Sequence, residues 1–412
     1  MIEKKYIVPL MMSALNIIFG FIFFAIISRQ NIEFLGIFSF VHSGSIILSH
    51  FFRFGTDFDI FKNSTDLKNL YGDEDNIINY MLTINLSSLL FLLIIHNLFS
   101  IPLMIFYTIL IAILLSLNVI IANFFRRKNY VLLYSVLLNS PFIIAALGSF
   151  LFTISNSFTA IYLFVGAFVI LLFFEIFLLK SELKIKLFKP IRFSAIKPIL
   201  SNLYPTFIGG IILLFMEQLP VLVFGWSGDF ESAAIFKIFS KICIVLVIIS
   251  NAFFAATIPE ISKTDFIQKG FIESLYNKAS SKAFILSVIY IAGIFLFLPI
   301  IMDIFNVQIL YINLLFLFIA SLVPVFSGPI NQLFIIFNQQ KYLMKILLSS
   351  LLIVGPITIL LIFEFGLEGA IASLLLFNLF WIVPSLFKFY SSNKINLFLP
   401  YYSYQKLTER KT

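Results

Sequence analysis

The chain alternates between long apolar runs and short polar segments along its length. About twelve of these runs approach the roughly 20 residues that an α-helix needs to cross a bilayer. Because lipid offers no hydrogen-bond partner to a free backbone N–H or C=O group, we expect each run to be helical. The runs fall at residues 6–28, 35–54, 77–97, 101–122, 131–152, 157–179, 198–224, 232–256, 282–302, 308–337, 344–363 and 367–389.

The composition excludes several classes of protein. Of 412 residues, 61% are hydrophobic and 12% are charged, about half the charge of a soluble domain, so a soluble enzyme and a disordered chain are excluded. The apolar runs are continuous rather than alternating, which excludes an outer-membrane β-barrel. The single cysteine, Cys243, allows no intrachain disulfide and no cysteine metal cluster. No phosphate-binding loop, metal-ligand motif or nucleophile elbow is present in the sequence, so we expect no cofactor, no metal and no catalytic residue.

The basic residues lie almost entirely in alternate loops. If the N-terminus is cytoplasmic, every Lys and Arg except Arg29, Lys237 and Lys241 falls in or beside a cytoplasmic loop or tail, as the positive-inside rule requires. We therefore predict that both termini are cytoplasmic. The formal net charge of +8 is then explained by loops beside anionic lipid head groups, and no nucleic-acid partner is expected.

The two halves of the sequence resemble each other. Residues 32–39 (IEFLGIFS) align with residues 230–237 (FESAAIFK) at the start of the second run of each half, and residues 125–130 align with 337–342 between the fourth and fifth. Six helices in each half make the repeats parallel, an arrangement in which transporters hold substrate between the halves. The predicted fold is thus all-α, a polytopic membrane protein of about twelve transmembrane helices in two parallel-repeat six-helix lobes around a central cavity. The predicted parts are an N-terminal lobe (1–179), a basic cytoplasmic linker (180–197), a C-terminal lobe (198–390) and a cytoplasmic tail (391–412).

Three charged residues lie well inside the predicted runs. A rise of ~1.5 Å per residue places Glu217 ~12 Å, Lys237 ~9 Å and Lys241 ~15 Å below the outer boundary. Each such charge costs at least ~2.5–3.5 kcal/mol unless it is paired or hydrated. Either Glu217 neutralises one lysine and locks two helices together, or a cationic site in a hydrated cavity attracts an anion such as a phosphate. The candidate substrate-binding residues are Lys237, Lys241, Glu217 and Arg29, the last being either an interface anchor or a guard of the outer cavity mouth.

Other polar residues within the runs have two interpretations. His42 and His50 lie on a stripe of Ser, His and Arg residues that covers an arc of ~160° in the run at 35–54. Because the unperturbed pKa of histidine is near 6.5, either could carry a coupled proton, or each could simply hydrogen-bond a neighbouring helix. Glu175 lies about one turn from the inner end of its run, where we expect it to snorkel toward water.

The run at 308–337 is the most interrupted. It contains Pro324, Gly328 and Pro329. Proline lacks the backbone donor that a helix interior requires, so we expect this helix to be bent or broken.

Several segments of the chain together carry a family resemblance. Residues 231–237 (ESAAIFK) and 252–262 resemble the eighth helix of polysaccharide flippases, and residues 298–305 are similar to the end of the ninth. Further similar segments are residues 337–341, 366–372 (GLEGAIA), 54–59 and 125–128. In this order, and over nearly the whole chain, they resemble the O-antigen and polysaccharide flippase family (polysaccharide biosynthesis exporters) of the multidrug/oligosaccharidyl-lipid/polysaccharide (MOP) superfamily.

The resemblance implies a V-shaped bundle of twelve helices with a central cavity, located in the bacterial inner membrane. It implies a flippase that moves an undecaprenyl-diphosphate-linked oligosaccharide, such as an O-antigen repeat unit, from the cytoplasmic to the outer leaflet by alternating access. The implied partners are that lipid-linked oligosaccharide, the bilayer and the polysaccharide polymerase machinery. Lys237 falls on the basic position of the eighth helix of the family.

Two alternatives stay open. A cation-coupled, multidrug-type exporter of small molecules has the same general architecture, but the drug-efflux branch commonly carries an acidic residue in its first helix, and residues 6–28 contain none. An integral-membrane glycan polymerase or ligase should carry a long outer loop with clustered basic residues, which this sequence lacks. We therefore expect a transporter rather than an enzyme.

Overall fold

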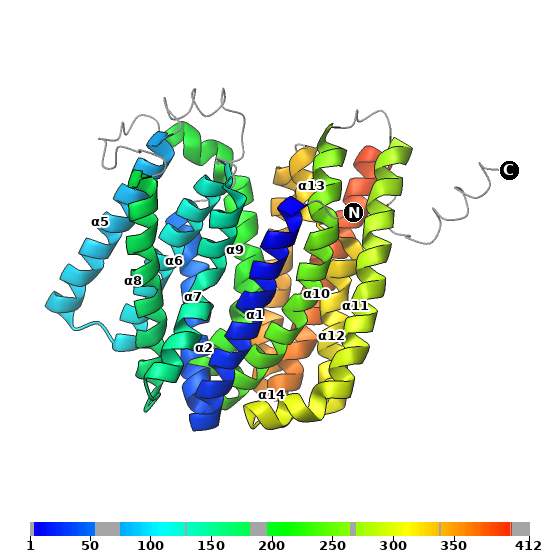
Figure 1. Cartoon of the computed structure of the whole chain (residues 1–412). Coiled ribbons are helices and arrows are strands. Elements are labelled where there is room, and N and C mark those ends of the chain that lie inside the picture. The colour runs from blue at the N-terminus through cyan, green and yellow to red at the C-terminus, as the bar shows by residue number, and fades with distance from the viewer. Residues whose placement is uncertain are drawn as a thin grey trace. The chain divides into compact units, whose positions relative to one another are not determined.

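The computed structural model describes residues 4–53, 75–127, 130–181, 196–263, 269–337, 339–395 and 397, and every regular element in these ranges is a helix (Figure 1). Eleven helical segments of the described residues are long and apolar enough to cross a membrane, one of them being the interrupted segment Tyr311–Ile336. This confirms the predicted all-α polytopic class. The helices are α1 (Lys4–Gln30), α2 (Ile32–Arg53), α5 (Asp75–Phe99), α6 (Leu103–Arg127), α7 (Val131–Leu151), α8 (Ser157–Ser181), α9 (Ile196–Ser227), α10 (Phe230–Lys263), α11 (Lys269–Phe305), α12 (Tyr311–Ser327), α13 (Ile330–Ile336) and α14 (Gln340–Asn393).

The longest helical run, α14, contains two membrane spans. A straight helix of its 54 residues would extend about 81 Å, far more than the ~30 Å of bilayer core. Gly366 breaks it with φ 57° and ψ −128°, a conformation open to glycine but strained for other residues. The turn brings Gly369 so close to the Leu361 carbonyl that a Cβ atom would collide with it. The spans predicted at 344–363 and 367–389 therefore lie on either side of this glycine.

The predicted break in the run at 308–337 is also confirmed. α12 ends at Ser327, Gly328 has φ 61°, and α13 begins after Pro329. The break frees backbone carbonyls within this helical run, and α11 supplies their donors. Tyr276 Oη donates to the Ser327 carbonyl at 2.5 Å, and Ser280 Oγ donates to the Phe326 carbonyl at 2.6 Å.

The chain forms two compact units, Met1–Ala234 and Ile235–Thr412. In the first unit, α1 packs against α7, and α2 packs against α6 and α9. In the second, α12 packs against α11 and α14. The boundary between the units falls within α10. The helix before it, α9, packs against α2 and therefore belongs to the first unit.

The predicted division into sequence repeats remains a prediction. Its boundary is the basic linker 180–197, of which residues 182–195 lie outside the described residues. Most of the predicted cytoplasmic tail, 391–412, also lies outside them.

Close helix packing in the first unit depends on glycine. A Cβ atom on Gly36 of α2 would collide with the carbonyl of Phe230, and one on Gly225 of α9 would collide with the Phe40 ring. Small residues are the usual means of close approach between membrane helices. Ser43 Oγ of α2 also donates to Gln218 Oε1 of α9 at 2.8 Å, so a buried polar contact joins the two helices.

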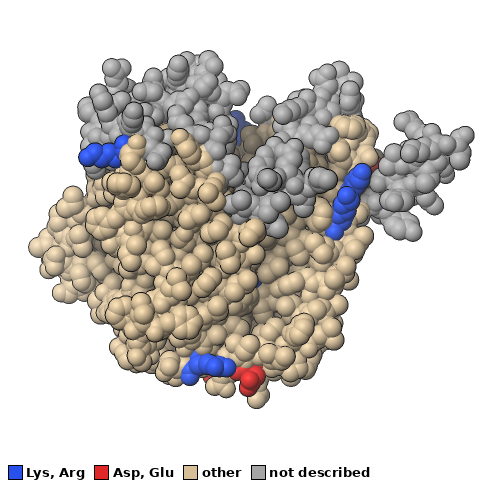
Figure 2. All heavy atoms as spheres, in the orientation of Figure 1, with Lys and Arg blue, Asp and Glu red and all other residues tan. Residues whose placement is uncertain are grey.

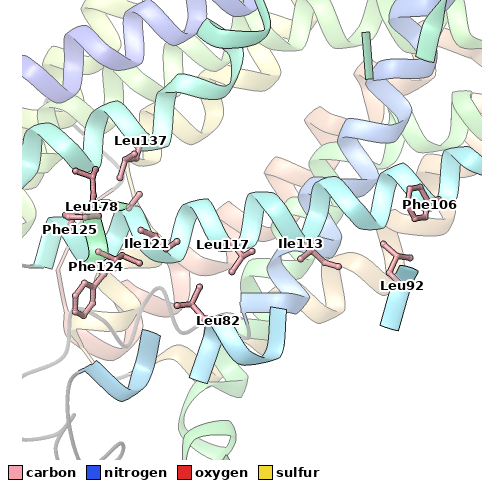
Figure 3. Packing of buried hydrophobic residues seen from close by; sticks show 12 residues of the cluster. Leu82, Leu92, Phe106, Ile113, Leu117, Ile121, Phe124, Phe125, Leu137 and Leu178 are labelled. Atoms are coloured by element: carbon pink, nitrogen blue, oxygen red, sulfur yellow. The ribbon is translucent and has the colours of Figure 1, made fainter. Parts of the chain in front are cut away.

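An apolar cluster fills the space between α5, α6, α7 and α8. Figure 3 shows its members, with side chains such as Leu117 and Ile121 of α6 extending toward the neighbouring helices. On the face seen in Figure 2, the described charged side chains appear at only a few places near the margins of the view, and most of the described surface is uncharged. This distribution is the one that a hydrocarbon layer requires.

We expect Tyr276→Phe to lower the free energy of unfolding by about 1–3 kcal/mol, because it leaves the buried Ser327 carbonyl without this donor. Unfolding in detergent micelles, followed by circular dichroism, measures the effect. Tyr311→Phe is the matched control, since Tyr311 is 54% exposed, and it should change stability by less than about 0.5 kcal/mol. Equal effects of the two substitutions would contradict the proposed capping of the broken helix.

Candidate functional site

The polar stripe of α2 is a packing face within the first unit. Ser39, Ser43, Ser45 and Ser49 are all buried. Ser45 Oγ bonds the carbonyls of Val41 (2.7 Å) and of Thr108 on α6 (2.9 Å). Serine hydroxyls that bond to their own or an adjacent helix are satisfied without water, so most of this stripe needs no aqueous cavity.

Both histidines of the stripe lie among aromatic rings. His42, 8% exposed, stacks on Phe38 with ring centroids 5.7 Å apart and meets the edges of Phe142 (5.5 Å) and Phe164 (5.4 Å). These contacts fix the ring of His42 where α2, α7 and α8 meet.

His50 lies further along α2 and faces α9. It is 4% exposed, stacks on Phe207 of α9 at 5.8 Å, and its Nδ1 lies 3.4 Å from Arg53 Nη2. The position of Gly210 on α9 makes room for the His50 ring, since a Cβ there would lie 2.6 Å from Nε2. Both histidines thus contact neighbouring helices, and a proton-coupling role for either remains a prediction.

The candidate substrate-binding residues are divided between the two units. Lys237 is buried in α10 with 7% of its surface exposed, and Lys241 is half-buried one turn later in the second unit. Glu217 is exposed on α9 of the first unit, and Arg29 is exposed near the end of α1. The sequence predicts that Glu217 contacts one of these lysines. Because Glu217 and the lysines belong to different units, this contact remains a prediction.

The expectation that Glu175 snorkels toward water is wrong. Its side chain is fully buried in the first unit, where Asn118 Nδ2 of α6 donates to Glu175 Oε1 at 2.7 Å. Cβ atoms of a helix lean toward its N-terminus, which carries Glu175 back into the bundle rather than toward the inner end of α8. The sequence signal was present, because Glu175 and Asn118 each interrupt a strongly apolar helix.

No metal centre is found among the described residues, where no group of three or more His, Cys, Asp or Glu side chains could hold an ion. The ionisable side chains within the described candidate spans include the buried Lys237, the half-buried Lys241, the exposed Glu217, the buried Glu175 and the two packed histidines. Such groups are expensive in a bilayer and mark functional sites more often than structural ones.

No protein-family model matches the chain, and no curated protein sequence matches it. Solved structures do. A multidrug MATE transporter of the MOP superfamily in an inward-facing conformation has a TM-score of 0.62 at 16% identity, covering 95% of this chain and 98% of that one. The MATE multidrug transporter DinF-BH, solved in complex with a ligand, has a TM-score of 0.65 at 16% identity, with 96% and 97% covered. An outward-facing MATE transporter has a TM-score of 0.62 at 14% identity, with 94% of each chain covered. The chain therefore has the fold of these MATE transporters.

Proposed function

We propose that this protein is a membrane exporter that works by alternating access, and that its substrate is a polyprenyl-diphosphate-linked oligosaccharide. The oligosaccharide moves from the cytoplasmic to the outer leaflet of the bacterial inner membrane. The fold supports the mechanism, because MATE transporters of this fold have been solved in inward-facing and outward-facing conformations. The substrate class is argued from the charges of α10.

Two lysines one turn apart in a membrane-spanning helix carry the proposal. Lys237 and Lys241 both lie inside the span Phe230–Phe254, and each ammonium group costs at least ~2.5–3.5 kcal/mol at that depth. Like charges four residues apart on a helix also repel each other. Packing alone is served better by apolar residues at both positions, so we assign the pair to binding an anion.

A diphosphate suits this pair chemically. An ammonium group is a compact point charge with three donors and is a common phosphate ligand in proteins. Two of them, one turn apart, can each donate to one phosphate group of a diphosphate. The sugars then occupy a hydrated cavity and the polyprenyl chain stays in the bilayer. The similarity of residues 231–237 to the eighth helix of polysaccharide flippases supports the same assignment for Lys237.

Export of small molecules is the second candidate, and one observation favours it. DinF-BH, which matches this chain over 96% of its length, is a multidrug transporter and was solved with a ligand bound. Two observations argue against a cationic drug as the substrate. Lys237 and Lys241 repel positive charge, and α1 carries no acidic residue over Lys4–Gln30. A MOP superfamily transporter from Pyrococcus furiosus Vc1 (TM-score 0.57) has been described as having a binding pocket of reverse polarity that suggests a different function. The fold has thus been associated with more than one pocket polarity.

Removal of the Lys237 charge should weaken flipping. In proteoliposomes with a fluorescent undecaprenyl-diphosphate oligosaccharide, we expect Lys237→Met to lower the apparent affinity roughly ten- to hundredfold, since a hydrogen bond to a charged group contributes about 1.5–3 kcal/mol. Lys237→Arg should retain most activity. Lys282→Met is the matched control, because it removes the same charge from an exposed position of α11.

The same liposomes separate the two candidate functions when a cationic rhodamine dye is offered as the small-molecule probe. The flippase proposal expects movement of the labelled lipid-linked oligosaccharide and no concentrative transport of the dye. Transport of the dye that Lys237→Met accelerates, without movement of the oligosaccharide, would favour the small-molecule exporter and refute the flippase.

The proposed orientation has its own test. Cys243 is buried, at 3% exposure, so a Cys243→Ser background gives a cysteine-free chain for labelling. In spheroplasts, a membrane-impermeant maleimide should label Ser155→Cys, in the predicted outer loop between α7 and α8, and should reach Lys186→Cys only after lysis. The reverse pattern would overturn the positive-inside assignment.

A further inference from the structure

A buried carboxyl group and a buried amide form a pair in the first unit. Glu175 of α8 has no exposed surface, and Asn118 of α6 is 2% exposed. Asn118 Nδ2 donates to Glu175 Oε1 at 2.7 Å and to the backbone carbonyl of Leu137 on α7 at 3.0 Å. A primary amide has two N–H donors, so both donors of Asn118 are in use.

The other oxygen of each group has no hydrogen-bond partner. Glu175 Oε2 and Asn118 Oδ1 are both buried, and neither forms a hydrogen bond in the described part of the chain. If Glu175 is ionised, Glu175 Oε2 and Asn118 Oδ1 are both hydrogen-bond acceptors without a donor. Each such buried acceptor lowers the stability of the folded protein. A buried negative charge without a cation would add a further cost.

The surroundings of the pair are apolar. Leu117 and Ile121 precede and follow Asn118 on α6, and Leu178 and Leu179 lie one turn beyond Glu175. All four belong to one buried cluster with Leu137, and Figure 3 shows Leu137 and Leu178 close together beside Phe125.

No charged side chain among the described residues compensates Glu175. The helices packed against α8 are α2, α6 and α7, and the only hydrogen bond to the Glu175 carboxyl from the described side chains comes from Asn118. The titratable or charged residues on these helices and on α8 itself are Glu33, His42, His50, Arg53, Tyr107, Arg126, Arg127, Tyr134, Tyr162 and Lys180.

One proton resolves these orphaned groups. A proton on Glu175 Oε2 turns that oxygen into a donor, and the unused acceptor on its existing partner is Asn118 Oδ1. A carboxylic acid and a primary amide that already share one hydrogen bond can form a second one between these two groups, and protonation also removes the buried charge. We infer that Glu175 and Asn118 form a proton-binding site within the α6–α7–α8 bundle, in which the carboxyl group is held as a neutral acid.

The site gives the exporter a means of proton coupling, a role that rests on the proposed transport function. The Oε2–H bond breaks only when water reaches the pair, and the proton then passes to that water and leaves a carboxylate. Hydration requires the contacts of α6, α7 and α8 to open, so proton release is linked to one conformational state.

Infrared spectroscopy of the full chain in nanodiscs tests the proton site directly. At pH 7, the difference spectrum between wild type and Glu175→Gln should contain the carbonyl band of a neutral carboxylic acid, and Asn118→Leu should move that band to higher frequency because its hydrogen bond is lost. Glu364→Gln, which removes an exposed acid, should leave the band unchanged. A carboxylate band assigned to Glu175 at pH 7, or a change of the Glu175 band on addition of Na⁺ alone, would overturn the inference.

The coupling role has a separate readout. In proteoliposomes with the fluorescent undecaprenyl-diphosphate oligosaccharide, a pH gradient should accelerate flipping by wild type and by Glu364→Gln, and should have no effect on Glu175→Gln. An equal response of Glu175→Gln would refute coupling through this site. The infrared result needs no transported substrate, so failure of the proton site and failure of the flippase proposal are distinguishable.

Discussion

Every backbone polar group at membrane depth needs a partner within the protein, and this constraint explains where the described helices break. The interruption between α12 and α13 is possible because Tyr276 and Ser280 of α11 donate to the freed carbonyls. The break at Gly366 instead occurs where α14 turns between two spans, and glycine is required there by φ 57°. A break inside a span thus needs side-chain donors from a neighbour, whereas a break between spans needs mainly backbone freedom.

The same constraint separates polar residues that pack from polar residues that await a ligand. Ser45 and Ser49 of α2 find backbone carbonyl acceptors on their own or an adjacent helix, as Ser45 does with Val41 and Thr108. Glu175 and Asn118 do not complete their hydrogen bonds with protein groups. Burial alone therefore does not mark a site in this protein. Glu175 and Asn118 are distinguished because they bond each other at one end and each keeps an orphaned oxygen at the other.

Most of the fold could be predicted from the sequence, since span length and loop charge are properties of consecutive residues. The spans on both sides of Gly366 were recognisable because Glu364 and Glu368 interrupt the apolar run. The environment of Glu175 was predicted wrongly for a different reason. α8 is apolar on all its faces, so its sequence fixes the depth of Glu175 but not the direction in which the helix turns it. Asn118 is recognisable in the sequence as a polar interruption of α6, but its partner on α8 is not, whereas the polar arc of α2 is visible because several residues share it.

The buried ionisable groups have different roles under the proposed mechanism. The lysines of α10 bind an anion in conformations that admit it, and Glu175 releases its proton in conformations that hydrate it. If one conformational change governs both anion binding and proton release, the free energy by which the anion affects the proton equals the free energy by which the proton affects the anion. A proton that crosses a potential of 100 mV contributes about 2.3 kcal/mol, which shifts an equilibrium roughly fiftyfold. A buried carboxyl group that takes its proton from water on one side of the membrane and releases it to water on the other side is therefore enough to give export a direction.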